Sequence, residues 1–427
     1  MTACPTSYAA PDPNRPAVSL KFTVSDDLRT VQGTESVTFH PDLPVTELVF
    51  RLTANTKPSV QQGNKIVVRT ATASPGGGRF TFSAANAEPS TQGGLLHIPL
   101  SPAIPAGGTV TAAISFAVTL GADSFDRFGT TRGFAYFGSA QPLLAWERGF
   151  GWHTEDMIDF TAESATSEAM DTDLEVTAPA KETVIASGNP ADPTTSSGGT
   201  RTWKSHLDAA RDVAVSVGPY VVADEKVDGV ALRVGAATPA IRDSLVPEFR
   251  RAIIELAKRF GPFPFPSLAV ARVPAAGGGI EYPGSILMLD GSRLVAVHET
   301  AHQWFYGMVG DSQSLHPWLD EAFASYAQEL VDGAAEHSQD LSVPGNVDSS
   351  TQSYGTDENG YYFTTYNKGS AALEAARDAA GPARVDAAIK CYVAKNAWRI
   401  ANPKDLAAAL AGLPAAISVL TKAGALK

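Results

Sequence analysis

Residues 298–302 read His298-Glu299-Thr300-Ala301-His302, inside a segment over residues 294–309 whose apolar spacing predicts a helix. Two histidines four residues apart on a helix lie one turn apart on the same face, so both imidazoles can bind one ion. Glu299 projects to the side of this pair. A metal held by two histidines needs a third protein ligand and an open position before it can catalyse a reaction. The stretch therefore predicts a metal-binding helix that the rest of the chain supports.

The candidate third ligand is Glu321, which follows His302 after eighteen intervening residues (321 − 302 − 1). It lies in the segment Trp318-Leu319-Asp320-Glu321-Ala322-Phe323-Ala324, on a second predicted helix that begins with Pro317. Two histidines and one glutamate suit a catalytic zinc with water in the fourth position. Zinc lowers the pKa of such a water to about 7, and Glu299 can then accept its proton and return it to a leaving amine. The pattern predicts one Zn²⁺ per chain and amide hydrolysis without a covalent intermediate.

The first half of the chain has the pattern of a β-domain. Apolar residues alternate in many short segments between residues 18 and 222, and turns rich in Pro and Gly separate these segments. We expect mostly antiparallel strands here, after an extended, Pro-rich lead-in over residues 1–17. The predicted strands are 18–24, 31–39, 47–52, 65–70, 79–83, 95–100, 110–120, 171–176, 181–186, 201–206 and 212–220.

The second half, residues 223–427, changes to a helical period. Residues 239–260 carry an apolar stripe at helical spacing and end at Gly261-Pro262. Strands are expected at 268–273 and 286–289, a loop at 338–359, and Ala-rich helices in the remainder. The predicted fold class is multi-domain α+β, with an N-terminal β-domain followed by an α-rich catalytic domain with a small sheet.

The composition limits the partners. The 427 residues carry a net charge of −12 and no basic stripe, which argues against binding to nucleic acid. No apolar run reaches the roughly 20 residues that span a bilayer, so we predict no transmembrane segment.

The only two cysteines are Cys4 and Cys391. We expect them not to pair, because Cys4 lies in the Pro-rich lead-in. The tripeptide Thr2-Ala3-Cys4 resembles the end of a bacterial lipoprotein signal, so a lipid anchor at Cys4 and an ordinary tail cysteine both stay open. The first interpretation places the protein outside the cytoplasm, secreted or anchored at a bacterial cell surface, and a cytoplasmic location is the alternative.

Three motifs in the same order resemble the aminopeptidase N family of gluzincin metallopeptidases. They are residues 298–305 with 318–324 after the eighteen-residue gap, Gly278-Gly279-Ile280-Glu281-Tyr282-Pro283, and Tyr366-Asn367-Lys368-Gly369. The second is similar to the family's Gly-x-Met-Glu-Asn motif and the third to its Tyr-x-Lys-Gly motif. The resemblance covers residues 18–427 and is to a short bacterial-type member without the large helical C-terminal domain of longer members. It implies a thermolysin-like catalytic domain.

The resemblance also implies roles for residues around the zinc. Glu281 would bind the free α-amine of the substrate, which a carboxylate holds well by a charge-assisted pair. Gly278 and Gly279 would let the substrate backbone lie against the sheet edge. Tyr366 would donate its hydroxyl to the oxyanion. Gln141 stands where some members place a second amine-binding residue.

Some features of the motifs leave alternatives open. Tyr361 and Tyr362 are rivals of Tyr366, although only Tyr366 precedes the Lys-Gly pair. Ile280 and Tyr282 replace the family's Met and Asn, and we expect both to alter the wall of the pocket.

The leading hypothesis is a zinc aminopeptidase that removes N-terminal residues from peptides with a free N-terminus. A zinc endopeptidase, an epoxide hydrolase on the same site and a non-catalytic binding module are the alternatives. The oligomeric state stays open, because the cleft is expected to be either open or covered by a second subunit.

Overall fold

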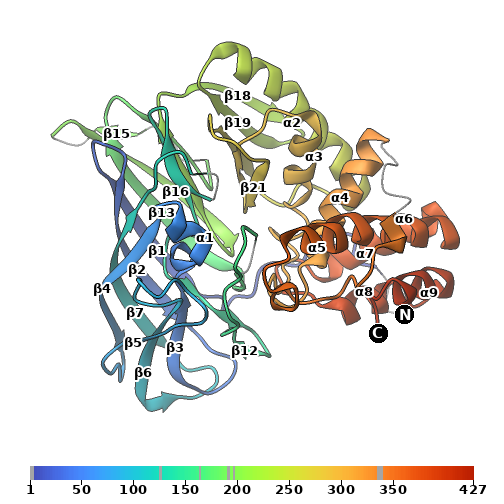
Figure 1. Cartoon of the computed structure of the whole chain (residues 1–427), viewed down its shortest axis with the longest axis horizontal. Helices are drawn as coiled ribbons and strands as arrows, with labels where there is room; N and C mark the ends of the chain where they lie inside the picture. Colours follow the sequence, from blue (N-terminus) through green and yellow to red (C-terminus); the bar gives the residue numbers. More distant parts are fainter. Residues whose placement is uncertain (1–3, 125–126, 163–164, 190–192, 196–197, 334–339) are drawn as a thin grey trace.

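The computed structural model describes residues 4–124, 127–162, 165–189, 193–195, 198–333 and 340–427. Figure 1 shows a β-rich part, formed by the first half of the chain, beside a part that contains nearly all the long helices. This arrangement confirms the predicted multi-domain α+β class. Among the described residues, no helix combines the length and the apolar character that crossing a membrane requires.

The β-domain is built on a seven-stranded sheet with the order β15-β16-β13-β1-β2-β7-β4, in which only β1 and β13 run parallel. Every second residue of β1 is buried, as expected for a strand with one face on a core. On that face Phe22 makes edge-to-face contacts with Phe116 and Phe137. The strands are β1 (Ala17–Val24), β2 (Thr30–Phe39), β4 (Lys65–Ser74), β7 (Val110–Thr119), β13 (Met170–Pro179), β15 (Thr194–Thr195) and β16 (Thr200–Ala210).

Two four-stranded sheets and a hairpin complete this domain. One sheet has the order β10-β3-β6-β5, and the other has the order β14-β17-β9-β8. The strands are β3 (Val45–Arg51), β5 (Thr81–Ser83), β6 (Leu95–Ile104), β8 (Phe128–Thr131), β9 (Phe134–Gly138), β10 (Leu143–Leu144), β14 (Thr183–Ala186) and β17 (Ala214–Gly218), with β11 (Trp146–Glu147) and β12 (Gly151–Trp152) as the hairpin. The short elements η1 (Thr53–Asn55) and α1 (Lys57–Gln61) follow β3.

A five-stranded sheet with the order β18-β19-β20-β22-β21 begins the catalytic domain. The helices α2 (Pro239–Phe260) and α3 (Arg293–Ala301) pack on one face, and residues of β9, β14 and β17 belong to the apolar cluster on the other. The outer strand β21 therefore lies at the junction of the two domains. The bounds are β18 (Val221–Val227), β19 (Val230–Ala236), β20 (Ser267–Arg272), β21 (Gly279–Tyr282) and β22 (Ser285–Met288). The boundary predicted at residue 222 falls inside β18, because Val221 and Val222 already pair with β19.

The remaining helices enclose a second core. Trp304, Phe305, Trp318 and Phe323 are fully buried in it, together with residues from most of the C-terminal helices. The elements are α4 (Trp318–Asp332), η2 (Asp340–Ser342), η3 (Thr351–Tyr354), α5 (Glu358–Tyr362), a π-helical turn η4 (Phe363–Lys368), α6 (Gly369–Ala380), α7 (Pro382–Lys395), α8 (Pro403–Ala409) and α9 (Pro414–Lys422). The loop predicted over 338–359 contains η2 and η3 and lies partly outside the described residues.

The helix predicted over residues 294–309 is too long, because α3 ends at Ala301 and His302 is its C-cap. Phe305 and Val309 then form a bridge, and Tyr306 takes a positive φ of 94°. The apolar residues after His302 are thus buried in a tight turn. Their spacing reflects the core and does not mark a continuing helix.

Candidate active site

The first two candidate ligands lie at the end of α3. Ser292 caps this helix, because its hydroxyl accepts a hydrogen bond from the amide of Val295 at 3.2 Å. His298 lies in the last turn and His302 caps the C-terminus. Their rings are 4.8 Å apart between centroids, so both imidazoles reach one point beside the helix.

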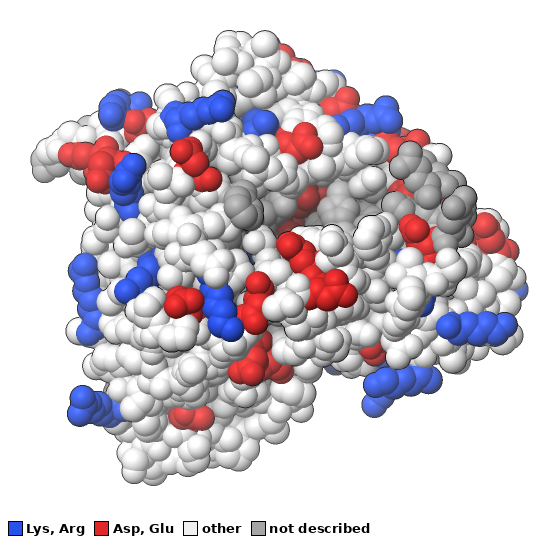
Figure 2. Space-filling view, viewed as in Figure 1, with Lys and Arg blue, Asp and Glu red and all other residues white. Residues whose placement is uncertain are grey.

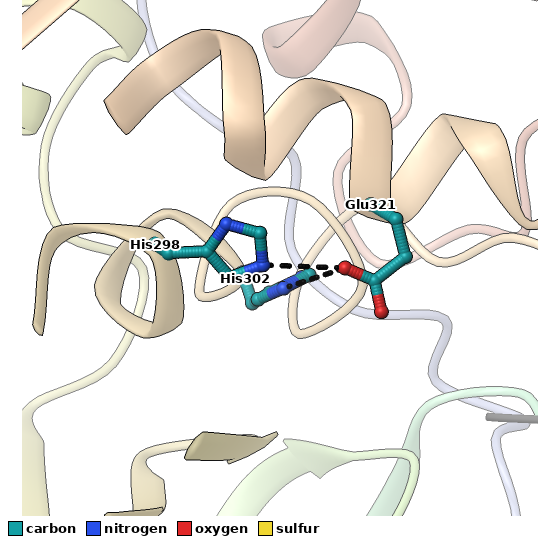
Figure 3. A group of neighbouring side chains, drawn as sticks. All are labelled: His298, His302 and Glu321. Atoms are coloured by element: carbon teal, nitrogen blue, oxygen red, sulfur yellow. Dashed lines mark hydrogen bonds and ion pairs between the residues drawn. The ribbon is translucent and has the colours of Figure 1, made fainter. Parts of the chain in front are cut away.

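The third candidate comes from the first turn of α4. Glu321 Oε2 lies 3.3 Å from His298 Nε2 and 3.4 Å from His302 Nε2 (Figure 3). A carboxylate in the first turn of a helix is favoured by the amide dipoles that point toward it. The structure therefore brings together the three residues that the sequence separates by up to 23 positions.

These three atoms fit a zinc ion. Ligand atoms about 2.1 Å from a tetrahedral metal are about 3.4 Å from one another. The measured separations of 3.3 and 3.4 Å agree with that spacing. Glu321 Oε2 thus lies at a tetrahedral ligand separation from both imidazole nitrogens, and all three atoms lie within 4.8 Å of one another, so these residues could hold a catalytic zinc ion.

Charges around the ligands also favour a cation. Burial lowers the pKa of His298, which favours the neutral imidazole that a metal needs. Burial works to raise the pKa of Glu321, but the charge on His302 and hydrogen bonds from both imidazoles bring it below its usual value. His302 Nδ1 also pairs with Asp320, which in turn accepts a hydrogen bond from Gln313 at 3.1 Å. Asp320 thereby fixes the ring so that its other nitrogen faces the site.

Glu299 and Glu281 lie on facing elements beside this centre. Both side chains are buried, and their carboxylate oxygens lie within 4.8 Å of each other and of a ring nitrogen of His302. Gly279 on β21 makes this approach possible, because a Cβ at that position would lie 2.4 Å from Cγ of Glu299. Gly278, by contrast, has no other atom within 4 Å of its Cβ position, so its backbone faces open space.

Tyr366 is placed against the histidines by the π-helical turn η4. Its ring is parallel to that of His298, with 6.0 Å between centroids and an interplanar angle of 4°. The rival Tyr361 is fully buried in a small apolar cluster. The other rival, Tyr362, lines the cleft but donates its hydroxyl to the carbonyl of Thr161 at 3.0 Å. Of the three, Tyr366 is the tyrosine that both lines the cleft and stacks on a candidate ligand.

Gln141, the candidate second amine-binding residue, and Tyr282, expected in the pocket wall, do not line the cleft. Gln141 is buried behind the cleft, and its amide nitrogen donates to Asp212 at 2.7 Å. The ring of Tyr282 occupies the space beside Gly138 of β9. The expectation that Tyr282 alters the pocket wall is therefore wrong, because Tyr282 is buried in the cluster between the domains and does not line the cleft. Ile280 does line the cleft.

The cleft has a volume of about 530 Å³ and opens between the two domains. Figure 2 shows the hollow, with acidic side chains at its floor and rim. Sequence reasoning did not identify several of its residues. Ser325 and Gln328 could have been found, because they follow Glu321 on the same face of α4. Val295, one turn before His298, and Asn367, inside the Tyr366–Gly369 motif, could have been found in the same way. Arg127, Thr161, Ala162 and Glu358 also line the cleft, and their positions carry no local signal.

Comparison with known proteins identifies the segment that carries these residues. Residues 290–421 match the family model described as the peptidase family M1 domain. This segment belongs to peptidase family M1. The M1 domain contains α3, α4 and η4, and so includes all three candidate zinc ligands together with Glu299 and Tyr366.

Two curated rice proteins, Aminopeptidase M1-B and Aminopeptidase M1-C of Oryza sativa subsp. japonica, are each 26% identical to the chain over 183 residues. The match covers 35% of this chain and 21% of each rice protein, so the chain aligns with about a fifth of the length of these relatives.

Solved structures are similar over nearly the whole chain. The M1 zinc metallopeptidase of Deinococcus radiodurans has 20% sequence identity and a TM-score of 0.72, with 98% of this chain and 95% of that chain covered. A mutant of the same protein bound to a Tyr-Ser-Ala substrate has a TM-score of 0.71 at 20% identity, with 96% and 94% covered. This likeness shows that the β-domain and the M1 domain form the two-domain fold of that metallopeptidase.

Proposed function

We propose that this chain is a zinc aminopeptidase that hydrolyses the N-terminal peptide bond of peptides with a free α-amine. The proposal unites the predicted ligands His298, His302 and Glu321 with Glu299, Tyr366 and Glu281 in one cleft. The names of the rice relatives and the substrate bound to the Deinococcus metallopeptidase support the same class of activity.

The observation that carries the proposal is the position of Glu281. Its carboxylate lies within 4.8 Å of a ligand nitrogen of His302 and of the carboxylate of Glu299. An extended residue spans about 3.5 Å, so an ammonium bound to Glu281 leaves room for one residue before the centre. The first carbonyl of the peptide then lies at the reacting position. An endopeptidase needs space for several residues on that side.

The side chains supply the remaining chemistry. Zinc, when bound, acts as a Lewis acid and lowers the pKa of a coordinated water to about 7. Glu299 accepts a proton from the attacking water and transfers it to the leaving amine. The hydroxyl of Tyr366 donates a hydrogen bond to the carbonyl oxygen as negative charge develops there. Glu281 binds the ammonium by a charge-assisted hydrogen bond.

The strand β21 orients the peptide. It is an outer strand of its sheet, and an extended peptide can add to such an edge by main-chain hydrogen bonds. Gly278 has open space where a side chain would stand, so the peptide backbone can approach it closely. The edge thus aligns the substrate between Glu281 and the zinc ligands.

The test is a pair of fluorogenic substrates that differ only at the N-terminus. An aminoacyl amide should be cleaved by zinc-loaded protein, and a chelator should abolish this cleavage. The N-acetylated form of the same compound should resist cleavage, because it cannot pair with Glu281. Equal kcat/KM values for the two compounds would contradict the proposal.

Substitution of Glu281, the proposed binding residue for the amine, makes the test more specific. Glu281→Gln should lower kcat/KM for the free-amine substrate by about 10- to 100-fold, since a hydrogen bond to a charged group contributes about 1.5–3 kcal/mol. Glu358→Gln is the matched control, because it removes the same charge from another position of the cleft. The preference for a free amine should survive the control and disappear in Glu281→Gln. The same loss in both variants would show that net charge, and not Glu281 itself, selects the substrate.

A further inference from the structure

A buried glutamine joins the β-domain to the candidate zinc site. Gln313 lies in the segment between α3 and α4, and only 2% of its surface is exposed. Its amide oxygen accepts a hydrogen bond from the backbone N–H of Ala165 at 3.2 Å, and Ala165 belongs to the apolar core of the β-domain. Its amide nitrogen donates to Oδ2 of Asp320 at 3.1 Å. One side chain therefore bonds to both domains.

Asp320 continues this chain of hydrogen bonds to a candidate zinc ligand. It is buried, and its two oxygens have different partners, since Oδ2 accepts from Gln313 and Oδ1 pairs with Nδ1 of His302. Because Nδ1 of His302 is held in this way, Nε2 is the ring nitrogen that faces Glu321, at 3.4 Å. The contacts thus run from Ala165 through Gln313 and Asp320 to the ring of His302.

The chemistry of its two partners fixes the orientation of the Gln313 amide. The N–H of Ala165 can only donate, and the carboxylate of Asp320 can only accept. An amide serves both at once, because its oxygen accepts and its nitrogen donates. A hydrocarbon side chain of similar length would leave both partners buried without this hydrogen bond, which costs free energy. Gln313 is therefore suited to hold Asp320 at one position relative to the β-domain.

A second set of contacts from the β-domain ends at the same residue, His302. Arg211 lies between β16 and β17 and is buried, and its guanidinium donates to the carbonyls of Ser167 at 2.8 Å and Met308 at 3.2 Å. It also donates to the carbonyl of Gly307 at 3.5 Å, and the amide of Gly307 donates to the carbonyl of His302 at 2.8 Å. The β-domain thus supports His302 both at its ring and at its backbone.

We propose that Gln313 is a positioning residue that couples docking of the β-domain to the binding of zinc. It acts through Asp320, which holds the imidazole of His302 in the orientation that presents Nε2 to the metal. This role rests on the zinc site of the proposed function and not on the identity of the substrate. By linkage the coupling works in both directions, so docking favours zinc binding and bound zinc favours docking.

The first experiment measures the zinc affinity of the full chain by competition with a chromophoric chelator. Gln313→Met keeps a side chain of similar length and removes both hydrogen bonds, so it should weaken zinc binding by about 10-fold. Thr166→Val is the matched control, because the hydroxyl of Thr166 donates to Ser312 at 3.2 Å in the neighbouring contact between the domains. It should leave the zinc affinity unchanged. An equal loss in both variants would show that a looser junction, and not Gln313, weakens the site.

A double-mutant cycle tests the route through Asp320. In the Asp320→Ala background, Gln313→Met should cause no further loss of zinc affinity, because its connection to His302 passes through the missing carboxylate. Two losses that multiply would show that Gln313 acts by another route, and would overturn the proposed role.

The second experiment uses wild-type protein and stays decisive if Gln313→Met does not fold. Hydrogen exchange followed by mass spectrometry reports on the backbone amides of residues 165–169 with and without zinc. The amide of Ala165 should exchange more slowly in zinc-loaded protein, since zinc favours the contacts that hold its acceptor Gln313. Equal exchange in the two states would contradict the coupling between the domains and the metal.

Neither readout depends on turnover, so the two proposals are judged separately. Zinc-loaded wild type that cleaves the free and acetylated substrates equally would overturn the proposed aminopeptidase and leave the role of Gln313 in place. Unchanged zinc affinity in Gln313→Met, together with the expected cleavage by wild type, would overturn the role of Gln313 alone. Wild-type protein that binds no zinc would overturn both.

Discussion

The buried carboxyl of Glu329 on α4, the helix that carries Glu321, allows a test of how burial makes stability depend on pH. This residue lies on α4, eight positions after Glu321, with only 4% of its surface exposed. Its carboxyl accepts a hydrogen bond from Ser370 at 3.0 Å and is hydrogen-bonded to Glu374 of α6. Burial and the nearby charge on Glu374 raise its pKa from 4.5 to about 9. The negative charge of Asp340 acts in the same direction, and Arg259 and Arg377 line the cavity beside it.

The raised pKa makes stability depend on pH. Between pH 4.5 and about 9, Glu329 is protonated in the folded protein and ionised in the unfolded chain. The folded state therefore binds one more proton, and the free energy of unfolding falls as pH rises by about 1.4 kcal/mol per pH unit. Between pH 6 and pH 8 this amounts to about 2.7 kcal/mol.

The variant Glu329→Gln should remove this dependence, because a neutral amide can donate and accept hydrogen bonds at every pH. Urea unfolding of both proteins at pH 6, 7 and 8 measures the effect. The stability of the variant relative to wild type should increase by about 2.7 kcal/mol from pH 6 to pH 8. Glu358→Gln, at an exposed position of α5, is the control and should track wild type. A difference between wild type and Glu329→Gln that stays constant within about 0.5 kcal/mol would refute the reasoning.

Three further predictions concern the site. Tyr366→Phe should lower kcat on an aminoacyl amide by about 100-fold with little change in KM, because it removes a donor needed mainly in the transition state. Asp320→Ala should weaken zinc binding by about 10- to 100-fold in competition with a chromophoric chelator, since His302 loses its partner. Gly138→Ala should lower the free energy of unfolding by about 1–3 kcal/mol in urea titrations, because the new methyl group would lie 2.1 Å from the ring of Tyr282.

Much of the fold follows from the sequence because its local signals agree. The predicted helix 239–260 has the bounds of α2, since Thr238 caps its start and Gly261 takes the positive φ that ends it. The predicted strands 18–24 and 31–39 correspond to β1 and β2, whose alternate residues face the core. Propensity, caps and periodicity point to the same structure at these positions.

The strands that were not predicted from the sequence lack these local signals of propensity, capping and periodicity. Every residue of β9 is buried, so the strand shows no alternation, and β8, β10, β11 and β12 are too short to form a pattern. β21 was expected only as a Gly-rich motif, because its pairing with β22 depends on the fold. The same limit applies to Arg127 and Thr161, which reach the cleft from the β-domain.

The distribution of charge in the cleft supports the proposed preference for a free amine. Glu281, Glu299, Glu321 and Glu358 line it, and Arg127 is the only cationic Lys or Arg side chain among its described lining residues. Arg127 acts on the buried carboxyl of Asp212, whose pKa burial raises and this charge opposes. A bound Zn²⁺ would offset two of these four negative charges and leave an excess of negative charge in the cleft beside the metal. A peptide that presents an ammonium to Glu281 would neutralise part of that excess, whereas an acetylated peptide brings no positive charge to the cleft and would leave the excess in place.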